Sequence, residues 1–419
     1  MVPVSIVLAA LSSASRSVCA QAAAAPPSEG VRSLAERAVT MAVPAELSLA
    51  DLESVLRQAT QERGSVLELE AIVPGPLREA ALDAAAPRWQ EWARVGKPAL
   101  VERLERELGG DGGMNRAAAL AIFQALESLW ATEQPVFETL RGQVEPAARP
   151  IIDRAESLRA EAFWGGHSEV LGPRFETLDL ETTIRGCAGL AGPLDAATAA
   201  SVDSLLSDYR RDRVRLLKLQ RRSVLSSAAE SNRIALDAQG WALARQRANP
   251  EQPIEPMEVV GLAMAAQLLP TMEVWRQLGE LQIATAESVA AMLGPVRGWC
   301  VYTAMWDSHP QPLTTEDATP SGQRIAAWIA ARQQAGDEAA LVRAEAWISA
   351  DAALVSRWLK EVLKSNIEAS ARIHTAVSSQ PIDFDALAEL VAESQREPPL
   401  HIQLANERLR SIDRLVGPQ

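Results

Sequence analysis

The chain has 419 residues, and one hydrophobic core rarely organises so many, so we expect two or three structural units. Its 47% hydrophobic and 23% charged residues are typical of a globular protein and exclude a largely disordered one. The formal net charge of −13 argues against broad nucleic-acid binding, which requires a basic surface.

The N-terminal segment resembles a secretory signal. Residues 2–11 are a short apolar run, and small residues with Val18-Cys19-Ala20 follow, although basic residues before the run are missing. We therefore expect residues 1–20 to be a signal peptide and the protein to be secreted or periplasmic. A buried N-terminal helix or a disordered leader is the alternative, with a cytoplasmic location. Residues 21–45 then form a leader and a short helix.

Hydrophobic periodicity predicts an all-α fold, because apolar residues recur at helical spacing and no run alternates as a β-strand would. Ser48 with Asp51 forms a capping-box-like start, and Asp195 is an N-cap candidate. Proline and glycine clusters mark the breaks between helices. The predicted helices cover residues 31–42, 48–72, 77–95, 98–108, 114–133, shorter pieces from Pro135 to Trp164, 178–190, a central helix from Asp195 extending to about 248, 257–282, 285–306, 321–334, 338–349, 351–377, 383–396 and 400–416.

The central helix is amphipathic. At 100° per residue, one face carries the apolar side chains Val202, Leu206, Tyr209, Leu216 and Val224. The opposite face carries a basic stripe, with two more arginines nearby. The stripe comprises Arg211, Arg215, Lys218 and Arg222, and the nearby arginines are Arg210 and Arg221.

The pattern of this helix also occurs earlier, which predicts a tandem duplication. Residues 54–70 align with 204–220 without a gap, and Arg63 and Arg213 take equivalent places on the two apolar faces. Three later matches keep the same order, and the last is A-[F/M]-W-x-x-H at 162–167 and 304–309. We therefore expect two related helical bundles at 46–172 and 173–312, and a C-terminal helical segment at 313–419.

Three sets of residues are candidates for function. Trp164 with His167 and Trp306 with His309 could line ligand pockets, although core packing and helix-end capping explain them more simply. The basic stripe could receive an acidic partner, although a solvated, partly neutralised face is the simpler interpretation. Arg63 and Arg213 are candidates for buried ion pairs, because an unpaired buried guanidinium is too costly.

After removal of a signal, two cysteines remain, Cys187 and Cys300. In an oxidising compartment they could form one disulfide that ties the start of the second bundle to its last helix. We expect two separate buried thiols instead.

The sequence contains no familiar catalytic, phosphate-binding or metal-binding motif. The most apolar stretch, 259–272, is too short to span a bilayer. We therefore expect no cofactor, no metal and no nucleic acid, and a noncatalytic exported scaffold that binds a protein or an anionic envelope component. The alternatives are a periplasmic chaperone-like or sensor-like protein with a groove for an unfolded or small ligand, and an enzyme with an unrecognised all-α site.

Overall fold

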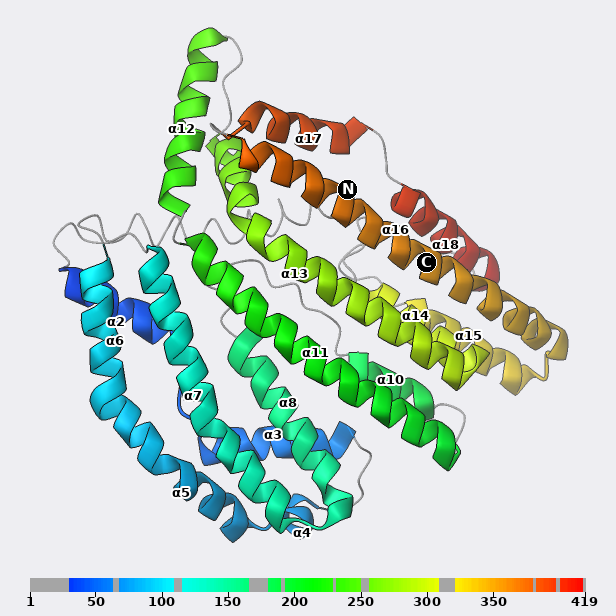
Figure 1. The fold of residues 1–419 in the computed structure, drawn as a ribbon. Coiled ribbons are helices and arrows are strands. Elements are labelled where there is room, and N and C mark those ends of the chain that lie inside the picture. Colours follow the sequence, from blue (N-terminus) through cyan, green and yellow to red (C-terminus); the bar gives the residue numbers. More distant parts are fainter. Residues whose placement is uncertain are drawn as a thin grey trace. The chain divides into compact units, whose positions relative to one another are not determined.

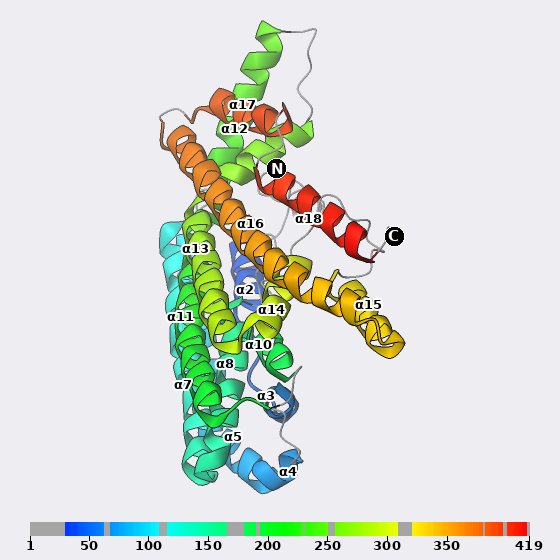
Figure 2. The ribbon, with the colours of Figure 1, turned by 90° about the vertical axis from the view of Figure 1, so that its right-hand side faces the viewer.

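A computed structural model gives the fold, and it confirms the all-α class. In the described part of the chain there are sixteen α-helices, one π-helical and one 3-10 segment, and no strand (Figures 1 and 2). The structure describes residues 30–62, 68–108, 115–165, 180–189, 193–228, 231–249, 256–308, 321–379, 382–396 and 400–416. Arg63, His167, His309 and the expected signal peptide lie outside these residues.

The chain forms two compact units, each built from separate stretches of sequence. The N-terminal unit contains Ala10–Arg174 and Val214–Val274, and the C-terminal unit contains Phe175–Arg213 and Trp275–Gln419. The division falls inside two long helices, so both helices contribute residues to both units. The predicted tandem duplication is not tested by this division and stays a prediction.

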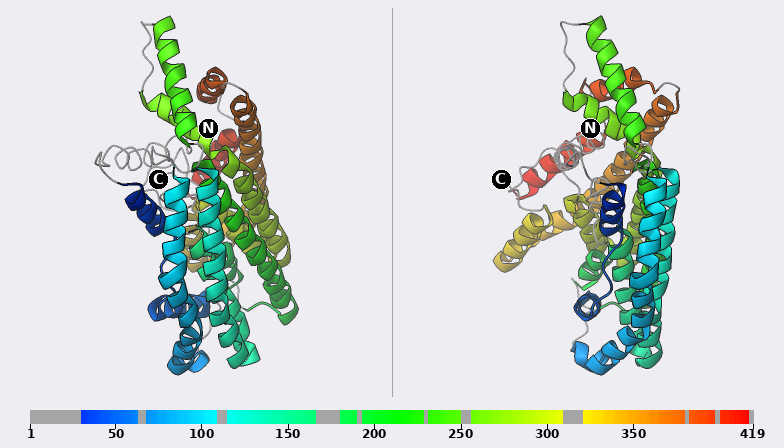
Figure 3. Two further views of the ribbon diagram at one scale, coloured as in Figure 1. Left: turned by 60° about the vertical axis from the view of Figure 1, so that its left-hand side comes forward. Right: turned by 90° about the vertical axis from the view of Figure 1, so that its left-hand side faces the viewer.

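In the N-terminal unit, long helices lie side by side and a short one crosses them. α5 packs along α7, α7 packs along α8, and α3 runs across α8 (Figures 1 and 3). Alanine and leucine fill most of the buried positions, which lets the helices approach closely. The elements are α2 (Val31–Ala42), α3 (Leu49–Glu62), α4 (Leu69–Ile72), α5 (Gly75–Glu91), π-helical η1 (Trp92–Gly96), α6 (Lys97–Glu107), α7 (Arg116–Gln143), 3-10 η2 (Pro146–Ala148) and α8 (Arg149–Gly165).

The local start signals are confirmed, but two predicted helices in this half differ from the structure. The helix expected at 48–72 is not continuous, because the backbone of Glu68 is extended (ψ 148°) and α4 begins after it. The Asp51 backbone N–H donates to Ser48 Oγ (3.1 Å), and the Ser48 N–H donates to Asp51 Oδ2 (3.2 Å), which is a reciprocal capping box. α7 continues through Pro135 instead of ending near residue 133. Val136, Phe137 and other later residues of α7 are buried, and this packing outweighs the hydrogen bond that proline removes.

The C-terminal unit is organised along α16, a helix of 41 residues. α18 lies alongside α16, and α14 and α15 pack on its first part (Figure 2). Beyond α8, the chain forms α10 (Leu180–Gly189), α11 (Ala196–Ala228), α12 (Ser231–Ala248), α13 (Pro256–Leu293), α14 (Pro295–Ser308), α15 (Ser321–Ala335), α16 (Glu338–Ser378), α17 (Phe384–Arg396) and α18 (Leu400–Val416).

Three predicted boundaries in this half are wrong. α16 is continuous where the sequence suggested a new helix at Asp351, because that carboxylate is buried against an arginine instead of capping a helix. The break expected between residues 282 and 285 is absent, since α13 continues to Leu293. The central helix α11 ends at Ala228, and its expected extension forms the separate helix α12.

The central helix otherwise follows its prediction. The Thr198 backbone N–H donates to Asp195 Oδ1 (2.9 Å), so Asp195 caps the first turn. Its predicted apolar face is buried at Val202, Leu206, Tyr209, Leu216 and Val224.

The expectation of two separate thiols is wrong. Cys187 and Cys300 form a disulfide that joins α10 to α14 within the C-terminal unit. The two helices pack together and bring the Cα atoms to 5.7 Å, a separation that a disulfide requires. This bond is compatible with export. None of the described helices is both long and apolar enough to cross a membrane.

Candidate functional site

Trp164, a predicted ligand contact, is a core residue of the N-terminal unit. Its side chain is 2% exposed and packs against the ring of Phe123 with 6.1 Å between centroids. Lys218 Nζ lies over the indole face at 5.5 Å and pairs with Glu127 at 2.6 Å. The indole is therefore covered by protein groups on this face, and its binding role stays a prediction.

Trp306 has similar surroundings in the C-terminal unit. It is 1% exposed, it packs against Trp358 at 4.4 Å, and the Arg408 guanidinium lies 4.5 Å from its ring centroid. Asp351 accepts hydrogen bonds from that guanidinium. The histidines that would complete both W-x-x-H candidates are outside the described residues.

The basic stripe on α11 is partly neutralised within the chain. Arg211 pairs with Asp208 at 2.9 Å, and Lys218 pairs with Glu127. Arg222 lies over the ring of Phe123 at 5.8 Å, and Arg215 is exposed. These contacts leave a binding role for the stripe untested.

The two arginines near the stripe are buried. Arg210 pairs with the buried Glu181 at 3.0 Å. Arg221 donates to the Ala42 carbonyl (2.9 Å) at the C-terminal end of α2, where the helix dipole favours a cation. Burial lowers the pKa of Arg221 to about 10.

Arg213 is half-buried, and its guanidinium lies over Tyr209 with 6.0 Å to the ring centroid. It also donates to the Tyr209 hydroxyl at 3.4 Å. Its assignment as one of two equivalent buried ion pairs stays a prediction, because Arg63 is outside the described residues.

Sequence reasoning missed the buried ion pairs that the structure contains. Each joins residues that are distant in sequence, so helical periodicity carries no signal for it. Burial raises the pKa of Glu133, and its bidentate contact with Arg159 opposes that effect. The pairs are Arg154–Glu62 (2.5 Å), Arg159–Glu133 (2.7 Å), Arg210–Glu181 (3.0 Å) and Arg408–Asp351 (2.8 Å).

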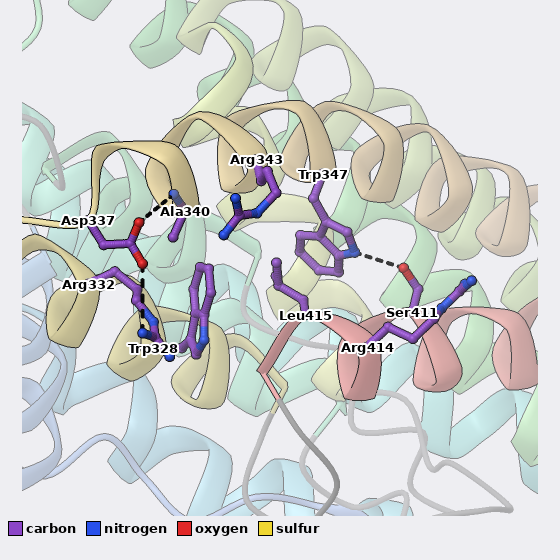
Figure 4. Close-up of a pocket in the computed structure, with 9 residues that line it drawn as sticks. All are labelled: Trp328, Arg332, Asp337, Ala340, Arg343, Trp347, Ser411, Arg414 and Leu415. Atoms are coloured by element: carbon purple, nitrogen blue, oxygen red, sulfur yellow. Dashed lines mark hydrogen bonds and ion pairs between the residues drawn. The ribbon is translucent and has the colours of Figure 1, made fainter.

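A cavity of about 580 Å³ in the C-terminal unit was also not predicted. Figure 4 shows it between α15, α16 and α18. Its size lies within the usual range for small-ligand sites. Two tryptophans, three arginines and one carboxylate line this cavity, and we call it the basic–aromatic pocket. Its lining residues are Trp328, Arg332, Asp337, Ala340, Arg343, Trp347, Ser411, Arg414 and Leu415.

One end of the pocket is held by contacts within α15 and the turn after it. Arg332 lies over the Trp328 ring at 5.4 Å and forms a 3.8 Å ion pair with Asp337. The Ala340 backbone N–H donates to Asp337 Oδ1 at 3.0 Å, so the same carboxylate also caps α16. Gly336 makes the turn between the helices with a φ of 68°, which glycine adopts without strain.

The other end is held by Trp347 on α16 and Ser411 on α18. Trp347 Nε1 donates to Ser411 Oγ at 2.7 Å, and Leu415 lies between the two indoles (Figure 4). Arg343 is exposed and has no ion pair with a described residue. The Arg414 guanidinium extends past Ser411, away from Trp328 (Figure 4).

A buried polar network positions α18 beside the pocket. Arg408 is 0% exposed, and its Nε donates to Asp351 Oδ1 on α16 at 2.9 Å. The same guanidinium donates to Ser321 Oγ on α15 (3.1 Å) and Thr303 Oγ1 on α14 (3.2 Å). One side chain therefore ties α18 to the three helices around it.

This network leads back to the pocket wall. Trp299 Nε1 donates to Asp351 Oδ2 at 2.9 Å, and its ring packs edge-on against Trp347 with 6.2 Å between centroids. Trp347 in turn bonds Ser411, three residues after Arg408 on α18. The contacts form a closed ring that starts and ends on α18, so the pocket wall rests on a hydrogen-bonded network.

A second cavity of about 420 Å³ lies in the N-terminal unit. The indole of Trp92 lines it and lies back over Gly96 in the π-helical segment, where a Cβ would be 2.2 Å from Trp92 Cε3. Arg88 and Glu91, which also line it, balance each other in charge. This cavity has no excess of either charge to select a ligand.

In the parts of the chain that are described, no group of three or more His, Cys, Asp or Glu side chains is placed to hold a metal ion. No protein-family model matches the chain, and no curated protein or solved structure is significantly similar to it.

Proposed function

We propose that this protein is an exported, noncatalytic interaction protein that binds an anionic partner in the basic–aromatic pocket. The observation that carries the proposal is the charge of the pocket in a chain of formal net charge −13. Three guanidiniums and one carboxylate line a cavity with two indole walls. Polar groups that converge on a partly apolar cavity are the usual features of a binding site.

The arginines support an anionic partner in particular. A guanidinium is always charged and matches a carboxylate or phosphate with parallel hydrogen bonds. Asp337 is already engaged by Arg332 and by the start of α16, so it does not neutralise Arg343. The pocket lining therefore has an excess of positive charge although the chain as a whole is acidic.

The signal-like N-terminal segment and the disulfide support export. Two related bundles remain part of the proposal. Trp164 and Trp306, which the duplication pairs, are both buried indoles with a cation over one face. This likeness supports a common origin of the two regions.

Calorimetric titration of the full chain with hexaglutamate, tripolyphosphate and 3-phenylpropionate tests the binding proposal. We expect at least one of these anions to bind, and Arg343→Gln to weaken its binding by about tenfold, or 1.4 kcal/mol. Arg357→Gln is the matched control, because Arg357 is exposed on the same helix but does not line the pocket. The proposal fails if none of the anions binds, or if Arg343→Gln leaves their binding unchanged.

A further inference from the structure

We infer that the ligand of the basic–aromatic pocket carries a single carboxylate beside a flat apolar group. The inference rests on the proposed function and specifies its ligand class. Two sources share this chemistry: a free aromatic acid, and the C-terminal residue of a polypeptide that ends in an aromatic side chain.

The arrangement of the arginines limits the ligand to one anionic group. Arg332 is already held by the Trp328 face and by Asp337. The Arg414 guanidinium points away from Trp328, and its Nε donates to the Arg410 carbonyl at 3.3 Å (Figure 4). Arg343 and Arg414 are the lining cations that have neither a carboxylate nor a ring partner among the described residues, and of these two only Arg343 points towards Trp328 (Figure 4).

Asp337 also disfavours a polyanion. Its carboxylate lines the same pocket and would repel a second negative group placed near Arg332. A planar guanidinium binds one carboxylate through two parallel hydrogen bonds, so Arg343 is sufficient for a monoanion. A phosphate chain or an acidic run of residues would require a second cation directed towards Trp328, whereas the Arg414 guanidinium extends away from it (Figure 4).

The walls select a flat apolar body next to the carboxylate. Trp328 and Trp347 present indole surfaces, and Leu415 lies between them in the view of Figure 4. The Trp347 N–H is already used by Ser411, so this ring offers apolar surface and no free donor. Aromatic groups pack favourably on such surfaces in offset or edge-on geometries.

Titrations of the full chain with matched probes test the inference. The probes are 3-phenylpropionate, 3-phenylpropionamide, propionate, tripolyphosphate, hexaglutamate, and Gly-Gly-Gly-Phe with a free or an amidated C-terminus. We expect 3-phenylpropionate to bind at least about tenfold more tightly than the amide, which lacks the charge, and than propionate, which lacks the ring. Comparing 3-phenylpropionate with Gly-Gly-Gly-Phe distinguishes the two sources. Tighter binding of 3-phenylpropionate indicates a free aromatic acid, and tighter binding of the peptide with a free C-terminus indicates a polypeptide end.

Two variants assign these effects to the pocket. Arg343→Gln should weaken 3-phenylpropionate to the level of the amide and leave the amide unchanged, whereas Trp328→Leu should weaken both. Arg357→Gln should change neither. Tighter binding of tripolyphosphate or hexaglutamate through Arg343 would overturn the inference and leave the proposed function standing. If no probe depends on Arg343, both are overturned.

Discussion

Trp306 and Trp164 show the same arrangement in two regions of the molecule. Each indole is buried, has a cation over one face, and that cation pairs with a carboxylate. Arg408 and Asp351 beside Trp306 are 0% and 2% exposed, whereas Lys218 and Glu127 beside Trp164 are 40% and 43% exposed. Removing a charge from water is costly, and bulk water screens an exposed pair. Breaking the buried pair should therefore change the free energy of unfolding far more than breaking the exposed pair.

The largest effect is expected when the buried pair is broken. Arg408→Ala leaves the Asp351 carboxylate buried without its counter-ion, so it should lower the free energy of unfolding by about 3–5 kcal/mol. Urea unfolding followed by circular dichroism and tryptophan fluorescence measures this loss. A loss below about 1 kcal/mol, typical of an exposed pair, would remove the distinction between the two regions.

The double variant Arg408→Met with Asp351→Leu is the control for that prediction. Apolar residues of similar volume often replace a buried ion pair at little cost, so much of the stability should return. The recovery should be incomplete, because Trp299 then loses the acceptor that Asp351 provides.

The disulfide gives the second-largest effect and lies in the same unit as the buried pair. Cys187 and Cys300 are 113 residues apart, and replacing both with alanine should lower the free energy of unfolding by about 2–5 kcal/mol. Urea unfolding of the oxidised chain and of the variant gives the difference. A reductant should destabilise the wild type and leave the variant unchanged. Equal stability of the oxidised wild type, the reduced wild type and the variant would show that the disulfide does not contribute to stability.

His401 on α18 makes the same unit sensitive to pH. Burial lowers its pKa from 6.5 to about 4, so the unfolded chain binds a proton there more readily than the folded one. The folded state is therefore most stable, as far as His401 is concerned, above about pH 6.5, where the imidazole is neutral in both states. This stability is lost as the pH falls towards about 4. The wild type should therefore lose on the order of 2–3 kcal/mol more than His401→Gln between pH 7 and 4. Parallel pH profiles of the two proteins would show that His401 does not contribute.

Most helices could be predicted from sequence because their signals are local. The boundaries of α2 and α18 follow from periodicity and from proline and glycine, and the Ser48 and Asp195 caps follow from residue type. Asp351 shows where this reasoning fails. An aspartate at that point suggests a helix start, but its partner Arg408 is 57 residues away.

The basic–aromatic pocket was missed for the same reason. Trp347 and Ser411 meet because α18 returns along α16, and nothing in either helix alone specifies that contact. Arg343 resembles any exposed helix residue until the indoles beside it are placed. The cysteine pairing also depended on which helices pack together, so composition left both alternatives open.

The smallest effect is expected at the exposed counterpart of the buried pair. Lys218→Ala removes the 2.6 Å contact with Glu127 and the cation over Trp164, and it should lower the free energy of unfolding by about 1 kcal/mol or less. Lys218→Met keeps most of the apolar stem over the rings, so it separates lost packing from lost charge in the same urea titration. Added salt should weaken the charge contribution of Lys218 and leave that of Arg408 nearly unchanged, because only the exposed pair is screened. A loss of about 3 kcal/mol or more for Lys218→Ala would contradict the comparison. It would mean that contact with the aromatic cluster, and not burial of the ion pair, determines how much such a pair contributes to the free energy of unfolding.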